Sequence, residues 1–382
     1  MYVKSRNVLI GDVLKPATLH VVDGKIKDIM PYEFQDAQDY GNCYIAPGFI
    51  DLHMHGGYGF DVLDDDQNSF TLLRRKLLDE GTTSFLATST TLEKEMLKVS
   101  LAKLGSKIGK QIAGDGASCL GIHLEGPFLN PKFAGAQKSC DILEPTIALF
   151  QEFQSASDFQ IKRITLAPEM DIDHSLITNL SNQEILVSIG HTGADAKEAR
   201  AAFVAGSKLV THMFNGMPPF HHREIGVSGM ALLCDGLSCE FIADGIHVSF
   251  DAIELACKVK GSENLILITD SNKSKGLPPG EYVFHGRNIV LNEQGEARIK
   301  ETGSLAGSTA KMNMVVKNII QNTTIDRVEA FKMASLYPAR LINVDDSKGL
   351  IDIGYDADFV VLDQQYQVIE TFAIGKRKDG NR

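Results

Sequence analysis

The stretch "GFIDLHMH" (residues 48–55) is an apolar, β-branched run that leads into two histidines one residue apart, His53 and His55. Alternate residues of a strand point to the same face, so the two imidazoles share one side and Met54 packs on the other. Two glycines follow at once, which is typical of a strand that ends in a turn. The stretch therefore predicts a strand that ends in a pair of possible metal ligands.

Seven further stretches have the same design, an apolar run that ends in polar residues. They span residues 83–90, 118–125, 162–169, 185–192, 208–215, 238–245 and 264–271. Helical patterns such as "ADAKEARAAFVAGS" (194–207) lie between them, and this one ends in a glycine that suits a C-terminal cap. Eight strands that alternate with helices predict an α/β fold, a (β/α)8 TIM-like barrel over residues 48–344. We expect a β-hairpin insertion near 280–300 and a closing helix over 326–343.

The two ends of the chain have a different character from the barrel. Residues 1–47 contain short β segments and a "DGK" turn at 23–25, and residues 345–382 repeat this pattern. We expect both ends to form one small β-sandwich domain, with the barrel inserted between its two halves.

Composition and charge exclude several classes of partner. The chain of 382 residues has a net charge of −11, so it offers no basic stripe for nucleic acid or an anionic membrane. The opening "MYVKSRNVLIGD" lacks the apolar core of a signal peptide, and no run approaches the length of a membrane span. The six cysteines form no C-x-x-C pair, which indicates reduced thiols. We expect a cytoplasmic protein without nucleic-acid or membrane partners.

Ionisable residues gather where the predicted strands end. They are His53, His55, Glu125, His191, His212 and Asp270. A single strand histidine is usually a hydrogen-bonded core group, but active sites of this barrel sit at the carboxyl ends of the strands. Six such residues at strand ends therefore favour a site. A mixture of imidazole and carboxylate suits Zn²⁺, Fe²⁺, Co²⁺ or Mn²⁺, and residue type alone leaves the choice open.

The two carboxylates suggest separate tasks. A buried Glu125 without a partner would be costly, so a cation beside it is expected, and this side chain is placed to bridge two ions. Asp270 follows the apolar run "LILIT" and is suited to take a proton from an activated water molecule. The alternative for Asp270 is a helix N-cap.

Seven short motifs carry a resemblance to a known family. They are "HLEGPFLN" (123–130), "GHTGADAKEA" (190–199), "THMFNGM" (211–217), "HHREIG" (221–226), "DGIH" (244–247), "LITDS" (267–271) and "LAGST" (305–309). Together they resemble the motifs of the N-acetylglucosamine-6-phosphate deacetylases, in the amidohydrolase superfamily, over nearly the whole chain. The resemblance implies hydrolysis of N-acetylglucosamine 6-phosphate to glucosamine 6-phosphate and acetate, as part of amino-sugar catabolism.

The resemblance also assigns residues and a cofactor. It implies that Glu125, His191 and His212 hold one metal ion, that His53 and His55 hold a second, and that Asp270 is the catalytic acid and base. One or two divalent ions per subunit are expected, zinc foremost, with iron, cobalt, manganese or nickel as alternatives. The residues matching the family's substrate contacts are Ala136, Asn215, Gly216, Arg223, His247, Ala306 and Gly307. In relatives the loop of Arg223 lies near a dimer interface, so a homodimer is implied.

Departures from the family pattern leave alternatives open. Ser271 stands where many relatives have alanine, Gly193 and Gly216 where asparagine and alanine are frequent, and Gln137 where many have histidine. These positions line the expected sugar pocket, so the C4 epimer N-acetylgalactosamine 6-phosphate is an alternative substrate. Another amide is a second alternative, because fold and metal site do not fix a substrate. A non-catalytic binding protein is the third, and the six filled ligand positions disfavour it.

Overall fold

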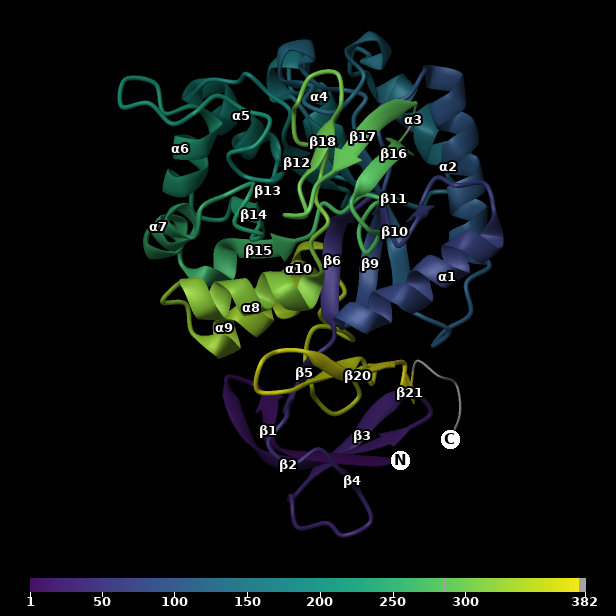
Figure 1. Ribbon diagram of the computed structural model, residues 1–382. Helices are drawn as coiled ribbons and strands as arrows, with labels where there is room; N and C mark the ends of the chain where they lie inside the picture. The colour runs from purple at the N-terminus through teal and green to yellow at the C-terminus, as the bar shows by residue number, and fades with distance from the viewer. Residues whose placement is uncertain (285, 378–382) are drawn as a thin grey trace.

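The computed structural model describes residues 1–284 and 286–377, arranged as a barrel and a smaller β domain that holds the N-terminus (Figure 1). Residues 378–382 of the expected C-terminal part, and residue 285 of the expected insertion, lie outside the described residues. Within the described part of the chain, no helix has the length and apolar character needed to cross a membrane.

Eight parallel strands form the barrel. They are β6 (Phe49–Met54), β9 (Thr82–Thr88), β10 (Ser118–Glu125), β11 (Ile161–Leu166), β12 (Leu186–Ile189), β13 (Leu209–Val210), β14 (Ser238–Ile242) and β15 (Leu265–Ile268). Each pairs with its neighbour in chain order. Closure lies just beyond the last and first strands, where the Asp270 N–H donates to the His53 carbonyl at 2.8 Å and Met54 bridges to Ser271. The predicted (β/α)8 barrel is confirmed.

Helices follow the strands and surround them (Figure 1). They are α1 (Gln67–Leu77), α2 (Lys94–Gly109), α3 (Ile147–Ala156), α4 (Ser175–Ser181), α5 (Ala196–Ala205), α6 (Gly226–Leu233), α7 (Phe250–Lys260), α8 (Met312–Asn322), α9 (Arg327–Met333) and α10 (Leu336–Leu341). The start of α5 shows how sequence sets these bounds. Asp195 and Glu198 cap it reciprocally, and Gly206 ends it at φ 124°.

Several strands end earlier than the apolar runs suggest. The expected strand over 208–215 is only Leu209–Val210, and the one over 264–271 ends at Ile268. The backbone explains the difference, because His191, His212 and Asp270 have φ angles of 48°, 30° and 48°. These left-handed conformations cannot continue a β ladder. The three ionisable residues therefore lie just beyond the ends of their strands.

The single closing helix expected over 326–343 is wrong, because the structure has α9 and α10 with a break at Ala334–Ser335. Pro338 has no N–H to bond the Ala334 carbonyl four residues earlier, and its ring crowds that carbonyl. The freed Ala334 carbonyl instead accepts the Ile50 N–H at 2.8 Å. The proline thus ties the closing helices to β6.

Strands from both ends of the chain form one sheet. Its members are β1 (Tyr2–Ile10), β2 (Val13–Val22), β3 (Lys25–Met30), β4 (Gln38–Asp39), β5 (Tyr44–Pro47), β19 (Phe359–Leu362), β20 (Val368–Ala373) and β21 (Lys376–Arg377). Side chains from β1, β2, β3, β5, β19 and β20 share one apolar cluster, so the sheet folds over on its own core. The small β domain built from both termini is confirmed, while its boundaries at residues 47 and 345 stay a prediction.

The insertion after β15 has three strands rather than the two expected. They are β16 (Gly280–Phe284), β17 (Arg287–Leu291) and β18 (Ala297–Ile299). A second turn adds the third strand, because the Asn292 side chain accepts the N–H groups of Gln294 and Glu296. This sheet lies at the end of the barrel opposite the small domain (Figure 1). Two further short strands, β7 (Gly56–Gly57) and β8 (Phe60–Asp61), pair after β6.

Candidate active site

The carboxylate of Glu125 lies at the centre of the converging strand ends. Its Oε1 is 3.3 Å from His53 Nε2, 3.2 Å from His191 Nε2 and 3.3 Å from His212 Nε2. Its Oε2 is 3.3 Å from His55 Nε2. One carboxylate therefore contacts all four histidines that the sequence singles out, and all five side chains are buried.

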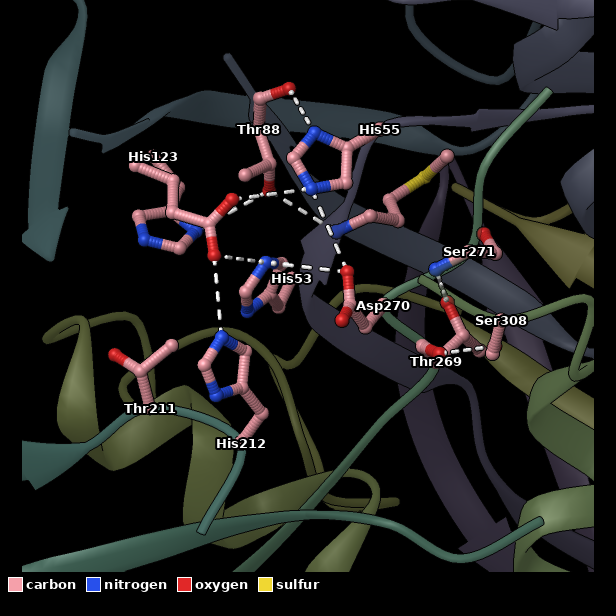
Figure 2. A network of polar contacts seen from close by, with 12 residues as sticks. His53, His55, Thr88, His123, Thr211, His212, Thr269, Asp270, Ser271 and Ser308 are labelled. Atoms are coloured by element: carbon pink, nitrogen blue, oxygen red, sulfur yellow. Dashed lines mark hydrogen bonds and ion pairs between the residues drawn. The ribbon is translucent and has the colours of Figure 1, made fainter. Parts of the chain in front are cut away.

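Asp270 closes the site on the side of the H-x-H pair (Figure 2). Its Oδ1 lies 3.4 Å from the Nε2 atoms of both His53 and His55. The alternative helix N-cap for Asp270 is wrong, because residues 271–279 form turns and bends rather than a helix. The carboxylate faces the histidines instead.

The converging groups have the composition of two metal sites. One cluster is Glu125, His191 and His212, and the other is His53, His55 and Asp270; within each, the ligand atoms lie within 4.8 Å of one another. Neither ring nitrogen of His53 has a hydrogen-bond partner among the described residues. Buried polar atoms almost always have a partner, so such a nitrogen facing two carboxylates fits a metal ion.

The charges of the site also call for a cation. Burial opposes the charged form, but Asp270 and Glu125 outweigh it and raise the pKa of His53 to about 9 and that of His55 to about 10. Burial would raise the pKa of Glu125, yet the histidines around it lower this pKa well below its usual range. The two carboxylates therefore need positive charge beside them. A divalent cation supplies it and leaves the imidazoles neutral.

Main-chain carbonyls orient three of the four histidine rings, so that their Nε2 atoms face Glu125. Their Nδ1 atoms each lie against a main-chain carbonyl, which fixes the proton on Nδ1 and leaves the Nε2 lone pair free for a metal. The pairs are His55 with Thr88 at 3.1 Å, His191 with Phe133 at 2.9 Å and His212 with Asn215 at 3.1 Å. The carbonyls thus orient the rings.

A cavity of about 190 Å³ opens above the two clusters. Six of the seven substrate residues expected from the sequence line it, together with His55, Glu125, His191, His212 and Asp270; the six are Ala136, Asn215, Gly216, His247, Ala306 and Gly307. His53 is fully buried beside the cavity. Sequence segments far apart are therefore brought to one concave site.

Gly307 shows how closely the "LAGST" segment packs here. It has φ 62°, and a Cβ at this position would lie 2.7 Å from the Asp270 carbonyl oxygen. The next residue, Ser308, donates its N–H to that same oxygen at 2.8 Å. Only glycine allows this approach without displacing Asp270.

The chain is similar to known proteins over nearly its whole length. The amidohydrolase family model matches residues 44–379. An N-acetylglucosamine-6-phosphate deacetylase of Bacillus subtilis is 39% identical over 372 residues, which cover 96% of this chain and 93% of that protein. The chain belongs to the N-acetylglucosamine-6-phosphate deacetylase family of amidohydrolases. It is thus in a family of metal-dependent amide hydrolases.

Solved structures and a further relative place the chain within this deacetylase family. A variant of the Mycobacterium smegmatis N-acetyl-D-glucosamine-6-phosphate deacetylase, in complex with N-acetyl-D-glucosamine-6-phosphate, is 28% identical with a TM-score of 0.93, and 99% of each chain is covered. The Thermotoga maritima deacetylase is 31% identical, with a TM-score of 0.88 and the same coverage. An Escherichia coli O157:H7 relative named N-acetylgalactosamine-6-phosphate deacetylase is 34% identical and covers 94% of this chain and 93% of its own length.

Arg223 is the one expected substrate-binding residue that does not line the cavity. It lies in an exposed loop between β13 and α6, and its guanidinium contacts the neighbouring His222 at 3.0 Å. A single chain therefore does not bring Arg223 to the site.

The cavity also contains cationic and polar residues that the sequence patterns did not single out as ligands. Lys138 and Arg287 line it, and Arg287 comes from β17 of the insertion. Gln137 donates to Glu125 Oε2 at 2.7 Å and accepts from the Thr91 N–H at 2.7 Å, so it holds the central carboxylate. The only sequence signal was the departure at Gln137 from the usual family residue.

His123, which precedes Glu125 by two residues on β10, does not line the cavity. Its Nε2 lies 2.7 Å from Thr165 Oγ1 and its Nδ1 3.2 Å from Thr88 Oγ1. Burial and the nearby Arg163 cation lower the pKa of His123 well below its ordinary value. It is a neutral interior group that packs edge-on against His53.

Proposed function

We propose that the protein hydrolyses the acetamide of N-acetylglucosamine 6-phosphate to glucosamine 6-phosphate and acetate. The observation that carries this proposal is the shared cavity, which is lined by side chains of both ligand clusters, Asp270 among them, and by six of the seven residues expected to bind substrate. The full-length likeness to deacetylases supports the same substrate.

The residues that would hold the metal follow from the two clusters. Glu125, His191 and His212 would hold one divalent ion, and His53, His55 and Asp270 a second, with Glu125 between them. When bound, such an ion supplies Lewis-acid chemistry that polarises the amide carbonyl and acidifies a water molecule. Zinc fits imidazole and carboxylate ligands best, and iron, cobalt, manganese and nickel are alternatives.

Asp270 would move the proton. Its carboxylate takes a proton from the attacking water as the new C–O bond forms at the amide carbon. It then returns this proton to the nitrogen as the C–N bond breaks, so acetate and a free amine leave. The Asp270 backbone is held by two hydrogen bonds. Its N–H donates to the His53 carbonyl, and its carbonyl accepts the Ser308 N–H. These bonds keep the carboxylate in place.

The polar end of the cavity would bind the phosphate and the sugar hydroxyls. Asn215, Gly216 and His247 line it, and His247 is paired with Asp244 at 2.7 Å, which favours its cationic form. Arg223 does not line the cavity of its own chain, so it can contribute to a site only if it comes from a second copy of the chain. We propose a homodimer on this ground, and a cytoplasmic location because a sugar phosphate does not cross a bilayer unaided.

The galacto epimer is the second candidate substrate, since one relative carries that name. Acetate release from both 6-phosphorylated N-acetylhexosamine epimers and from their unphosphorylated parents, with elemental analysis of the same sample, tests the proposal. Preference for the phosphorylated gluco epimer is expected. Equal rates with and without phosphate would contradict the proposed phosphate site.

Arg223→Met is the companion test. We expect it to raise KM for the phosphorylated sugar about tenfold or more, the scale of one lost charge-assisted contact, and to leave the unphosphorylated parent unaffected. Mixing this variant with an Asp270→Asn variant tests the dimer, because one of the two sites in a mixed dimer then has both wild-type residues. Unchanged KM in Arg223→Met would remove Arg223 from the site.

A further inference from the structure

His53 differs from the other three histidines of the site in what its Nδ1 faces. The other Nδ1 atoms lie against main-chain carbonyls. That of His53 lies 3.5 Å from Oε2 of Glu240, while its Nε2 faces Glu125 and Asp270. Figure 2 shows His53 beside Asp270. A metal-bound histidine is commonly fixed by a carboxylate on its other nitrogen. Glu240 has the position for that role.

Glu240 is itself held rigidly inside the barrel by Arg163. Both side chains are fully buried, and the guanidinium of Arg163 on β11 contacts both carboxylate oxygens of Glu240 on β14. The remaining three N–H groups of Arg163 donate to Ser188 Oγ at 3.0 Å, the Leu52 carbonyl at 3.0 Å and Thr211 Oγ1 at 3.3 Å. All five donors of the guanidinium are thus satisfied, which fixes the orientation of the carboxylate.

A buried ion pair is weak evidence for stability, because well-packed apolar residues of similar size often serve as well. The interior of such a barrel is normally filled by branched apolar side chains. The contacts of Glu240 suggest why charge is present here. Its Oε2, which lies 3.5 Å from His53 Nδ1, accepts the main-chain N–H of His212 at 3.3 Å. One carboxylate therefore touches a histidine of each ligand cluster.

We infer that Glu240, fixed by Arg163, is a positioning residue that sets the tautomer and orientation of His53. The proton stays on Nδ1, toward Glu240, and the Nε2 lone pair points to the cluster of His53, His55 and Asp270. Glu240 thereby sets how tightly this second cluster binds its ion. The inference rests on the proposed two-metal site, but it concerns metal binding and is measurable without substrate.

Titration of metal-free protein with Zn²⁺ in a calorimeter, with elemental analysis after dialysis, tests the inference. A His55→Ala variant identifies which class of sites belongs to the second cluster. We expect Glu240→Gln to weaken that class 10- to 100-fold, the usual effect of losing such a partner. The ¹⁵N shifts of His53 are expected to change from one fixed tautomer to a mixture.

Two further variants separate positioning from general damage. Glu80→Gln breaks another fully buried ion pair, with Lys275 at 2.6 Å, that does not touch a site histidine, so it is expected to keep both ions. Arg163→Met with Glu240→Leu removes both interior charges, and we expect this double variant to fold with the second class still weakened. It decides the question if Glu240→Gln alone does not fold.

Three results would overturn the inference: wild-type affinity in Glu240→Gln, full affinity restored in the double variant, or no class of sites removed by His55→Ala. Acetate release is measured on the same samples. If the protein binds zinc in two classes of sites and Glu240→Gln weakens the second class as expected, but no acetate is released, the proposed function is refuted and this inference stands.

Discussion

The two ring nitrogens have different partners in three of the site histidines, His55, His191 and His212. Nδ1 lies against a main-chain carbonyl, and Nε2 faces Glu125. Because the carbonyl fixes the proton, the orientation of each ring is set by the backbone of a strand end or loop. The site is therefore organised before any ion or substrate binds, which lowers the cost of binding either.

Asp270→Asn tests the proton-transfer role at the level of one residue. The amide has nearly the same shape but cannot take up a proton from water, so we expect kcat to fall by a factor of about 10² or more with little change in KM. Steady-state kinetics with metal-replete protein measure this, and elemental analysis checks that the ion of the Glu125 cluster remains. Near-normal turnover would show that Asp270 does not transfer the proton.

His247 gives the site a pH dependence. Burial would lower the pKa of His247, but Asp244 at 2.7 Å outweighs it and raises this pKa above the ordinary value of about 6.5. The ion pair stabilises the fold fully below the ordinary pKa, and this contribution is lost as pH rises through the raised one. We expect kcat/KM for the phosphorylated substrate to fall over the same range, as the cation facing the phosphate is lost.

The matched variant for this pH profile is Asp244→Asn. Without the carboxylate the pKa of His247 drops, so the alkaline fall in kcat/KM is expected at lower pH than in the wild type. The unphosphorylated parent sugar is the control, because its profile lacks this contribution. If the alkaline fall in kcat/KM does not move in Asp244→Asn, a group other than His247 is responsible for it.

At the scale of elements, the sequence predicts the ends of those strands and helices that stop at a local signal such as glycine or proline. The strand over 118–125 was predicted to the residue, since Gly126 and Pro127 end it. The strand near His212 was overestimated, because a left-handed φ of 30° at a histidine has no local signal. Pro338 is a local sequence signal for the break in the closing helix, because a proline cannot donate the helical hydrogen bond to the carbonyl four residues earlier.

The insertion β16–β18 contributes a cation to the cavity, and Arg287→Ala tests its importance. Arg287 lines the cavity and donates to the Gln137 carbonyl at 2.9 Å, so it also links the insertion to the residue that holds Glu125. We expect KM for the phosphorylated substrate to rise by roughly tenfold or more, the scale of losing one hydrogen bond from a charged group.

Lys300→Ala, in the turn directly after β18, is the control in the same insertion. Lys300 pairs with Glu281 on the surface at 2.7 Å and does not line the cavity, so its loss is expected to leave KM unchanged. Equal effects of the two variants would mean that the insertion acts through its fold and not through the Arg287 cation.

At the scale of the whole molecule, the barrel, the small β domain and the strand-end cluster were all predictable from the repeated apolar runs and the polar residues after them. The contacts between residues of separate segments were not. Lys138 reaches the cavity from a loop and Arg287 from β17 of the insertion, and only the folded chain shows that they lie together. Arg223 is the opposite case: a sequence motif predicts it as a site residue, but in the single chain it lies exposed at the surface.

Metal removal is expected to affect the stability of the whole barrel, because the ligands come from strands spread around it. An ion that binds only the folded state adds about 2.7 kcal/mol when its free concentration is about 100 times Kd. We expect chelation to abolish acetate release and to lower Tm by a few degrees, both restored by the added ion. Calorimetry of the two forms measures the change, and an unchanged Tm would show that the ion contributes little to folding.

The most direct test of the account is to locate the metal in crystals of the zinc-loaded protein by anomalous scattering at the zinc edge. We expect a peak about 2.0–2.2 Å from a carboxylate oxygen of Glu125 and from the Nε2 atoms of His191 and His212. A peak elsewhere, or these three side chains in place with no metal between them in fully loaded protein, would contradict it.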